Sequence, residues 1–258
     1  MNGATGQVAR AVLRRTTIHT YKNPAIIIPA LAFPLVFLVA FAGGLSAVSK
    51  VPGFDFAAGY TAFQFVFVFL QMAAFGGIFS GYRLAEDFES GFARRLLVAA
   101  PSRIGLIIGY VLAGLLRYGL IGVILWGLAL ATGMTVRGGV LEIAGLVLLG
   151  ALVSAACALW SIGLALRYRS VDIGSFMQTP IFVLLFLAPV YVPLVLLSGW
   201  IHAAALVNPF TLLLDAGRGF IAGEPEKAVA AFAAALGLLA LMWLWATLQL
   251  RRAERPAV

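Results

Sequence analysis

The chain has 258 residues, of which 62% are hydrophobic and 11% are charged, and its formal net charge is +8. Because soluble domains are only roughly half apolar, this composition excludes a soluble globular protein and predicts one all-α integral membrane domain over residues 1–258. The single Cys157 excludes an intramolecular disulfide, and His19 and His202 are too isolated to form a metal site. We expect no catalytic residue, metal or cofactor on this chain.

Six apolar runs are each long enough to cross a bilayer, which takes about 20 apolar residues. They lie at about residues 25–48, 56–79, 104–132, 140–166, 173–197 and 228–250. The sequence therefore predicts six transmembrane helices, with both chain ends on the same side. We expect a kink in the fifth helix, because Pro180, Pro189 and Pro193 each remove a helical hydrogen bond.

Basic residues gather on one side of this arrangement. Thirteen of the 18 Lys and Arg residues lie on the same side as the chain ends, and four lie in the connections on the other side. The positive-inside rule therefore places both termini in the cytoplasm of a protein that crosses the plasma or inner membrane, among its lipids. Since this distribution accounts for the net charge, we expect no nucleic-acid partner.

The first 23 residues, 1–23, are too polar to cross the membrane. Val8, Val12 and Ile18 give them a modest apolar stripe, so we expect an amphipathic helix on the cytoplasmic surface. The Arg14–Arg15 pair also fits a twin-arginine signal peptide. An uncleaved anchor is favoured, because no small-residue cleavage site follows convincingly and the next apolar run is long enough to span.

A charged segment, residues 86–101, separates the second and third expected spans. Phe88, Phe92 and Leu96 recur at four-residue spacing, so a helix over residues 88–99 would place them on one face. Acidic residues precede basic ones, as the helix dipole favours, and Pro101 would end the helix. This pattern predicts a short helix parallel to the membrane that contacts a partner. The alternative is a solvated loop whose charges only fix the topology.

Polar side chains within the expected spans are candidates for a translocation path: Gln64, Gln71, Arg117 and Gln178. Arg117 lies well inside the third span, where a charge costs roughly 2.5–3.5 kcal/mol, so it should face protein or water. It either attracts an anionic head group or bonds to a carboxylate or to free helix carbonyls. The glutamines either line the path or tie helices together, and Gly105 and Gly109 form a Gly-x3-Gly pair typical of close helix packing.

Two motifs resemble those of the permease subunits of type-2 ABC transporters, the family of daunorubicin-resistance permeases and polysaccharide exporters. The first lies between the second and third spans and consists of Glu89, Gly91, Leu96, Leu97, Pro101, Ser102 and Arg103. The second is NPFTLLLDAGRGFIAG, residues 208–223, within an expected outer re-entrant or surface helical segment at 200–227.

The resemblance implies a permease that forms the path for ATP-driven export of a hydrophobic or amphipathic drug or lipid, with antibiotic resistance as a possible outcome. It implies two copies of an ATP-binding ABC subunit, which bind ATP and Mg, and a second permease chain as homodimer or heterodimer. The chain has no Gly-x4-Gly-Lys-Ser/Thr loop to cradle phosphates, so we expect the energy to come from the partner.

The resemblance also assigns roles to residues. ATPase coupling falls on the segment between the second and third spans, at Glu86, Asp87, Phe88, Glu89, Gly91, Phe92, Arg94, Arg95, Leu96, Pro101 and Arg103. An outer gate falls on Asn208, Pro209, Thr211, Asp215 and Arg218. Asp215 and Arg218, three residues apart, can also pair locally.

The alternatives are a secondary transporter or channel subunit and, with less support, an intramembrane lipid enzyme. A proton-coupled transporter would need acids or histidines in the spans, whereas Arg117 is the ionisable residue found in their cores. A lipid enzyme would need converging acids, histidines or a nucleophile with its base, and no such set is visible. An exporter permease is therefore preferred, with the identity of its substrate left open.

Overall fold

The computed structural model describes residues 3–22, 24–44, 51–52 and 54–253. These residues form helices and no strands, which confirms the predicted all-α class. In chain order the elements are α1 (Gly3–Lys22), α2 (Pro24–Gly44), α3 (Gly59–Glu89), α4 (Phe92–Ala99), α5 (Ile104–Ala131), α6 (Val140–Tyr168), η2 (Val171–Ile173), α7 (Gly174–Phe186), η3 (Leu194–Leu196), α8 (Gly199–Val207), α9 (Pro209–Ala222) and α10 (Ala228–Ala253).

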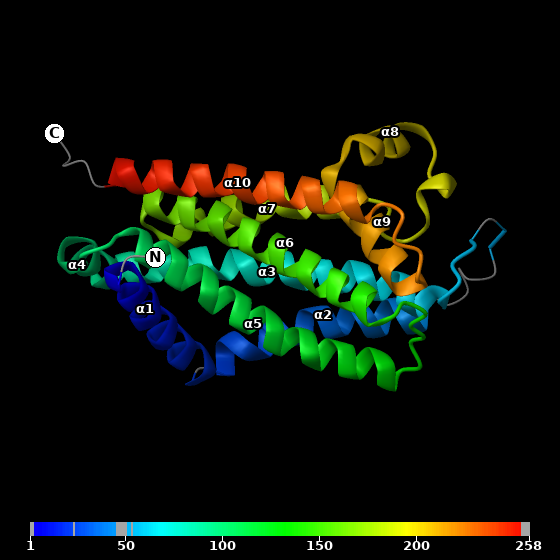
Figure 1. Cartoon of the computed structure of the whole chain (residues 1–258), viewed down its shortest axis with the longest axis horizontal. Helices are drawn as coiled ribbons and strands as arrows, with labels where there is room; N and C mark the ends of the chain where they lie inside the picture. Colours follow the sequence, from blue (N-terminus) through cyan, green and yellow to red (C-terminus); the bar gives the residue numbers. More distant parts are fainter. Residues whose placement is uncertain (1–2, 23, 45–50, 53, 254–258) are drawn as a thin grey trace.

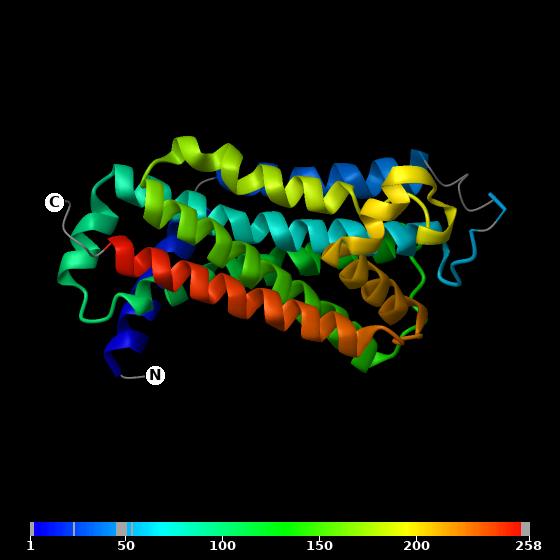
Figure 2. The ribbon, with the colours of Figure 1, turned by 90° about the horizontal axis from the view of Figure 1, so that it is seen from above.

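Helix α3 lies at the centre of the bundle, in contact with α2, α5, α6, α7 and α9 (Figures 1 and 2). Its sequence is apolar on all sides, as expected for a helix without a solvent face, and nearly all of its side chains from Tyr60 to Phe88 are buried. Helix α10 packs against α6 and α9 and leaves most of its apolar surface exposed. Lipid tails can cover such a surface without cost.

Small residues bring α3 and α6 into close contact. A Cβ atom added at Gly77 would lie 2.2 Å from the carbonyl oxygen of Ser154, and one at Gly81 would lie 2.4 Å from Cβ of Ser161. Larger residues at these two positions would force the helices apart. Close backbone approach of this kind stabilises helix pairs in membranes, where lipid supplies no hydrophobic driving force between helices.

Among the described residues, four helices are long and apolar enough to cross a membrane, namely α3, α5, α6 and α10, and they match the second, third, fourth and sixth expected spans. The first expected span corresponds to α2, and its last residues, 45–48, lie outside the described residues.

The fifth expected span is shorter than predicted. Helix α7 ends at Phe186, and the chain then follows an irregular path to η3. Pro180 is tolerated inside α7, whereas Pro189 lies in irregular chain and Pro193 directly precedes the short 3-10 helix η3. Because proline lacks an N–H and disfavours helical geometry in the preceding residue, the closely spaced pair ends the helix instead of kinking it.

The two ends of the bundle differ in structure (Figure 1). At one end lie α4, the α6–α7 turn and the end of α10, and at the opposite end lie α8 and α9. We refer to them as the α4 end and the α9 end. Helix α1 packs against the start of α5, where Cβ atoms added at Gly105 and Gly109 would lie 2.8 and 2.6 Å from Cβ of Val8 and Val12. This confirms close packing at the Gly-x3-Gly pair.

Candidate functional site

The charged segment is divided between two helices. Helix α3 continues to Glu89, and α4 begins at Phe92 after a turn at Gly91, whose φ of 75° is the left-handed conformation that glycine favours. The prediction of one helix over residues 88–99 is therefore wrong at its start. Asp87 and Phe88 belong to the last turn of α3, and both are buried.

Asp87 joins three helices at the α4 end. Arg15 of α1 donates two hydrogen bonds to its carboxylate, from Nη1 at 2.6 Å and from Nη2 at 2.8 Å, and Tyr110 of α5 donates a third. The paired geometry is the strong form of a guanidinium–carboxylate contact. Hydrogen bonding to Asp87 raises the pKa of Arg15 above its ordinary value. The buried carboxylate is therefore balanced mainly by Arg15, with Arg83 of the same helix 3.7 Å away.

The same end is tied to the rest of the bundle by Glu89 and Arg15. The Glu89 carboxylate accepts hydrogen bonds from the Ser170 hydroxyl at 3.0 Å and from the Val171 backbone N–H at 2.8 Å, both in the α6–α7 connection. The Arg15 guanidinium lies 3.7 Å above the ring of Phe92, the first residue of α4. Helix α4 thus lies against a base formed by α1, α3 and the α6–α7 connection.

One face of α4 is free. Arg94, Arg95 and Val98 are exposed, and Val98 has 87% of its surface accessible. Their spacing of three and four residues places them on one side of the helix. We call these three residues the α4 face. Val98 escaped the sequence analysis, although its spacing from Arg94 could have identified it.

The remaining predicted coupling residues surround this face. Leu96 is half-buried against the core, while Glu86, Pro101 and Arg103 are exposed. Glu86 pairs with Arg83 one turn earlier in α3. The segment therefore contains a buried anchor and an exposed surface, where the sequence alone predicted one amphipathic helix.

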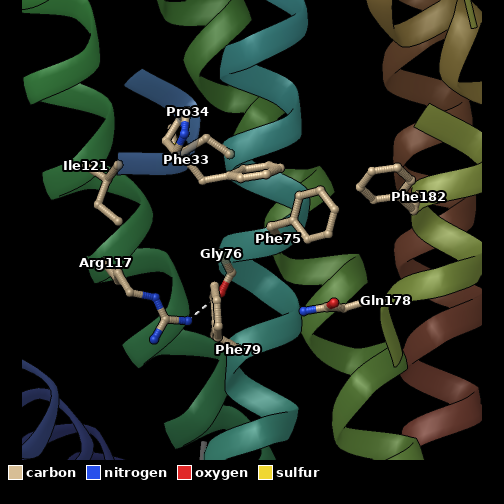
Figure 3. Close-up of a pocket in the computed structure, with 10 residues that line it drawn as sticks. Phe33, Pro34, Phe75, Gly76, Phe79, Arg117, Ile121, Gln178 and Phe182 are labelled. Carbon is tan, nitrogen blue, oxygen red and sulfur yellow. Dashed lines mark hydrogen bonds between the residues drawn. The ribbon is translucent and has the colours of Figure 1, made fainter. Parts of the chain in front are cut away.

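A cavity of about 260 Å³ lies in the middle of the bundle, between α2, α3, α5 and α7 (Figure 3). It is lined mainly by aromatic and aliphatic side chains, together with Arg117 and Gln178. Arg117 and Gln178 extend toward α3 from opposite sides. Of the four polar residues predicted to line a path, the structure brings these two together.

Arg117 is buried with 6% of its surface accessible. Its Nη2 donates a hydrogen bond to the carbonyl of Gly76, and its guanidinium lies 5.6 Å from the Phe79 ring centroid. Nε has no partner, and no carboxylate among the described residues pairs with Arg117. A helix carbonyl, one of the partners predicted for Arg117, is therefore present and satisfies one of the five N–H donors of its guanidinium.

The two other glutamines lie away from this cavity. Gln64 donates hydrogen bonds to the Tyr60 hydroxyl at 2.7 Å, in its own helix, and to the Val190 carbonyl at 3.1 Å, so it ties α3 to the irregular chain after α7. Gln71 is buried, and neither atom of its amide has a hydrogen-bond partner. The structure gives no physical account of Gln71.

The asparagine–proline motif starts α9. The side-chain oxygen of Asn208 accepts a hydrogen bond from the Phe210 N–H at 2.9 Å, and its amide donates to the Leu184 carbonyl at 2.6 Å. Asparagine before the first turn and Pro209 at its first position are favoured at helix starts. Thr211, in the same turn, is buried and its hydroxyl has no partner. The motif thus sets where α9 begins and fastens it to the end of α7.

Arg218 is the buried cation of the α9 end. Its guanidinium lies 3.3 Å from the Phe63 ring centroid, and it donates to the Val190 carbonyl at 3.2 Å and the Phe63 carbonyl at 3.5 Å. Val190 lies in the irregular chain after α7, so its carbonyl lacks a helical partner. Arg218 and Gln64 supply one, as non-helical backbone at membrane depth requires.

Asp215 and Arg218 lie near each other, but among the described residues they form no direct ion pair. Arg218 turns into the bundle, and Asp215 instead accepts a hydrogen bond from Lys227 at 2.7 Å. Both cations line a cavity of about 500 Å³ at the α9 end, which four acidic residues also line: Asp55, Asp215, Glu224 and Glu226. This cavity is therefore acidic overall, in contrast to the one at Arg117.

Comparisons with known proteins identify the family. No curated protein matches the chain. A family model described as ABC-2 type transporter matches residues 7–221, most of the chain's 258 residues. Such membrane components work with an ATP-binding ABC subunit. The specific likeness to daunorubicin-resistance permeases stays a prediction. The chain therefore belongs to the ABC-2 type transporter family and is a multi-pass membrane permease component.

Proposed function

We propose that this permease exports a hydrophobic or amphipathic drug or lipid, driven by two ATPase subunits. Each ATPase subunit binds the α4 face of one permease chain. In this proposal both termini lie in the cytoplasm of the plasma or inner membrane. The chain crosses six times, with α2 and an extended α7 segment completing the spans. It pairs with a second permease chain around a central path. A role in antibiotic resistance would follow if the substrate is a toxic drug.

The observation that supports coupling at α4 is the contrast between its two sides. One side rests on the network around Asp87, and the other presents two arginines and an almost fully exposed valine. In this proposal, movement of an ATPase bound at the exposed side of α4 is passed on to the helices that hold its other side. The basic α4 face fits a docking surface with acidic groups and an apolar recess, since complementary charge governs partner choice.

A pull-down tests this role. The purified chain carrying Arg94→Glu, Arg95→Glu and Val98→Asp should recover about tenfold less ATP-hydrolysing activity than the unaltered chain, because docking loses an apolar contact and two attractive charges. The matched control is Arg251→Glu with Arg252→Glu, an exposed arginine pair at the end of α10, at the same end of the bundle.

The control should recover the ATPase as well as the unaltered chain does. Equal recovery with the α4 variant would remove the α4 face from coupling, and equal losses in both variants would show a general charge effect instead of a docking site.

A further inference from the structure

The cavity at Arg117 holds a positive charge that the described residues leave unbalanced. Arg83, another buried arginine, lies beside the carboxylates of Glu86 and Asp87. Among the described residues, Arg117 donates to the Gly76 carbonyl, faces the ring of Phe79 and lies near the neutral Tyr21, and its Nε is unpartnered. A charge held inside a membrane protein faces a partner, a substrate route or water. An anion is the partner that would balance this charge.

The walls of the cavity indicate what accompanies that anion. Phe75 lies 5.9 Å from Phe33 and 5.9 Å from Phe182, measured between ring centroids. The three rings form an aromatic row across α2, α3 and α7, on one side of Arg117 (Figure 3). Phe33 and Phe182 are 42% and 41% exposed, so the row continues to the surface of the chain. This row suits an alkyl chain.

The size of the cavity limits what enters it. Pockets that enclose a drug-sized molecule measure about 300–1,000 Å³, whereas this cavity measures about 260 Å³. It has room for a head group and the first part of a chain, with the remainder lying along the exposed rings. Gln178 lines the cavity on the side opposite Arg117 and adds an amide that can donate a hydrogen bond to a bound molecule.

We propose that this cavity binds the anionic head group, phosphate or carboxylate, of an amphiphile that the permease exports, between Arg117 and Gln178, with its apolar chain along Phe33, Phe75 and Phe182. The identity of this amphiphile as cargo rests on the export function proposed above. Binding at the cavity itself does not depend on that function.

Binding is tested on the purified full-length chain in an uncharged maltoside detergent. Dodecyl phosphate should raise the thermal unfolding temperature in a saturable manner, and inorganic phosphate and dodecyltrimethylammonium should not. Arg117→Gln should weaken the apparent affinity about tenfold or more, as expected for a lost hydrogen bond to a charged group. Arg117→Lys should retain part of the effect, because it keeps the charge but loses the two-pronged geometry.

The matched control is Arg137→Gln, which removes an exposed arginine after the far end of the same helix and should leave the affinity unchanged. An equal response of Arg117→Gln and the unaltered chain would overturn the site, and so would equal stabilisation by dodecyltrimethylammonium. If Arg117→Gln fails to fold, Arg117→Lys decides the test. Stabilisation of Arg117→Lys by dodecyl phosphate but not by dodecyltrimethylammonium would support the site, and equal stabilisation by both would overturn it. Equal stabilisation by inorganic phosphate and dodecyl phosphate would show that the apolar chain adds nothing, and would overturn the proposal that the ligand is an amphiphile.

Cargo is distinguished from a resident lipid in the complex with the ATPase. Dodecyl phosphate should stimulate ATP hydrolysis by the reconstituted complex. Dodecyl phosphate should not stimulate the complex carrying Arg117→Gln, whereas the Arg137→Gln control should keep both its basal hydrolysis and the stimulation. Binding without stimulation would identify a resident lipid and overturn the cargo assignment. Absence of any ATPase partner would instead contradict the proposed function and leave the binding result intact.

Discussion

Buried charges are paired at the α4 end, whereas the buried charge in the middle of the bundle is unpaired among the described residues. At the α4 end the Asp87 carboxylate accepts hydrogen bonds from Arg15 and Tyr110, so its charge is balanced and the bonds hold three helices together. In the middle, Arg117 lies beside a cavity with one carbonyl acceptor and no carboxylate among the described residues. A paired charge maintains the structure, whereas an unpaired charge beside a cavity is available to a ligand.

Arg218 lies between these two cases. Among the described residues no carboxylate is bonded to it, yet an aromatic face and two carbonyls surround it closely. One of those carbonyls, at Val190, exists as a free acceptor only because α7 ends early. Arg218 therefore acts as a structural clamp. The three sites predict three different responses to removal of the arginine.

The largest loss of stability is expected at the α4 end. Arg15→Ala leaves the Asp87 carboxylate buried without its main partner, which costs about 3 kcal/mol of unfolding free energy. The control is Arg14→Ala, the exposed neighbour in the same helix, which should stay within about 0.5 kcal/mol. Thermal unfolding in an uncharged detergent measures both. Similar values for the two variants would contradict a network centred on Asp87.

An intermediate loss is expected at Arg218. Arg218→Met removes two charge-assisted hydrogen bonds and the contact with Phe63, for a loss of about 2 kcal/mol. Lys227→Met is the matched control, since Lys227 lines the same cavity but forms an exposed pair with Asp215 worth about 0–1 kcal/mol. A larger effect from Lys227→Met would show that the acidic cavity, not the clamp, stabilises the α9 end.

The smallest effect is expected at Arg117. Arg117→Met loses one carbonyl bond and also removes an uncompensated buried charge, so stability without added anion should change by less than about 1 kcal/mol or increase. The same unfolding assay measures it. A loss of about 3 kcal/mol would mean that Arg117 is a structural clamp like Arg218, and it would erase the contrast between the two cavities.

Much of the fold could be predicted from the sequence, because the length of an apolar run and the distribution of charge are set by consecutive residues and need no knowledge of tertiary contacts. The sequence placed the helices later seen as α3, α5, α6 and α10, and the Gly105–Gly109 contact. It missed the early end of α7, because whether a proline kinks or ends a helix depends on partners for the freed carbonyls. For Val190 those partners are Gln64 and Arg218, both distant in the chain.

The candidate site was less predictable for the same reason. Asp87 looks like a solvated acid in its local sequence, and its main partner when buried is Arg15, 72 residues earlier. Arg117 was recognised as unusual, but its neighbourhood with Gln178 and the aromatic row depends on how α5 and α7 pack around α3. Pattern analysis finds such residues, and the tertiary arrangement decides whether they are clamps or binding groups.

The most direct test of the central claim, that this permease moves an amphiphile using energy from a separate ATPase, is a leaflet-transfer assay in liposomes. Fluorescently labelled anionic lipid would be followed by its accessibility to a membrane-impermeant quencher. Liposomes with the permease–ATPase complex should transfer the lipid when ATP is hydrolysed, and not with a non-hydrolysable ATP analogue. Equally fast transfer by the permease alone without ATP would contradict the account.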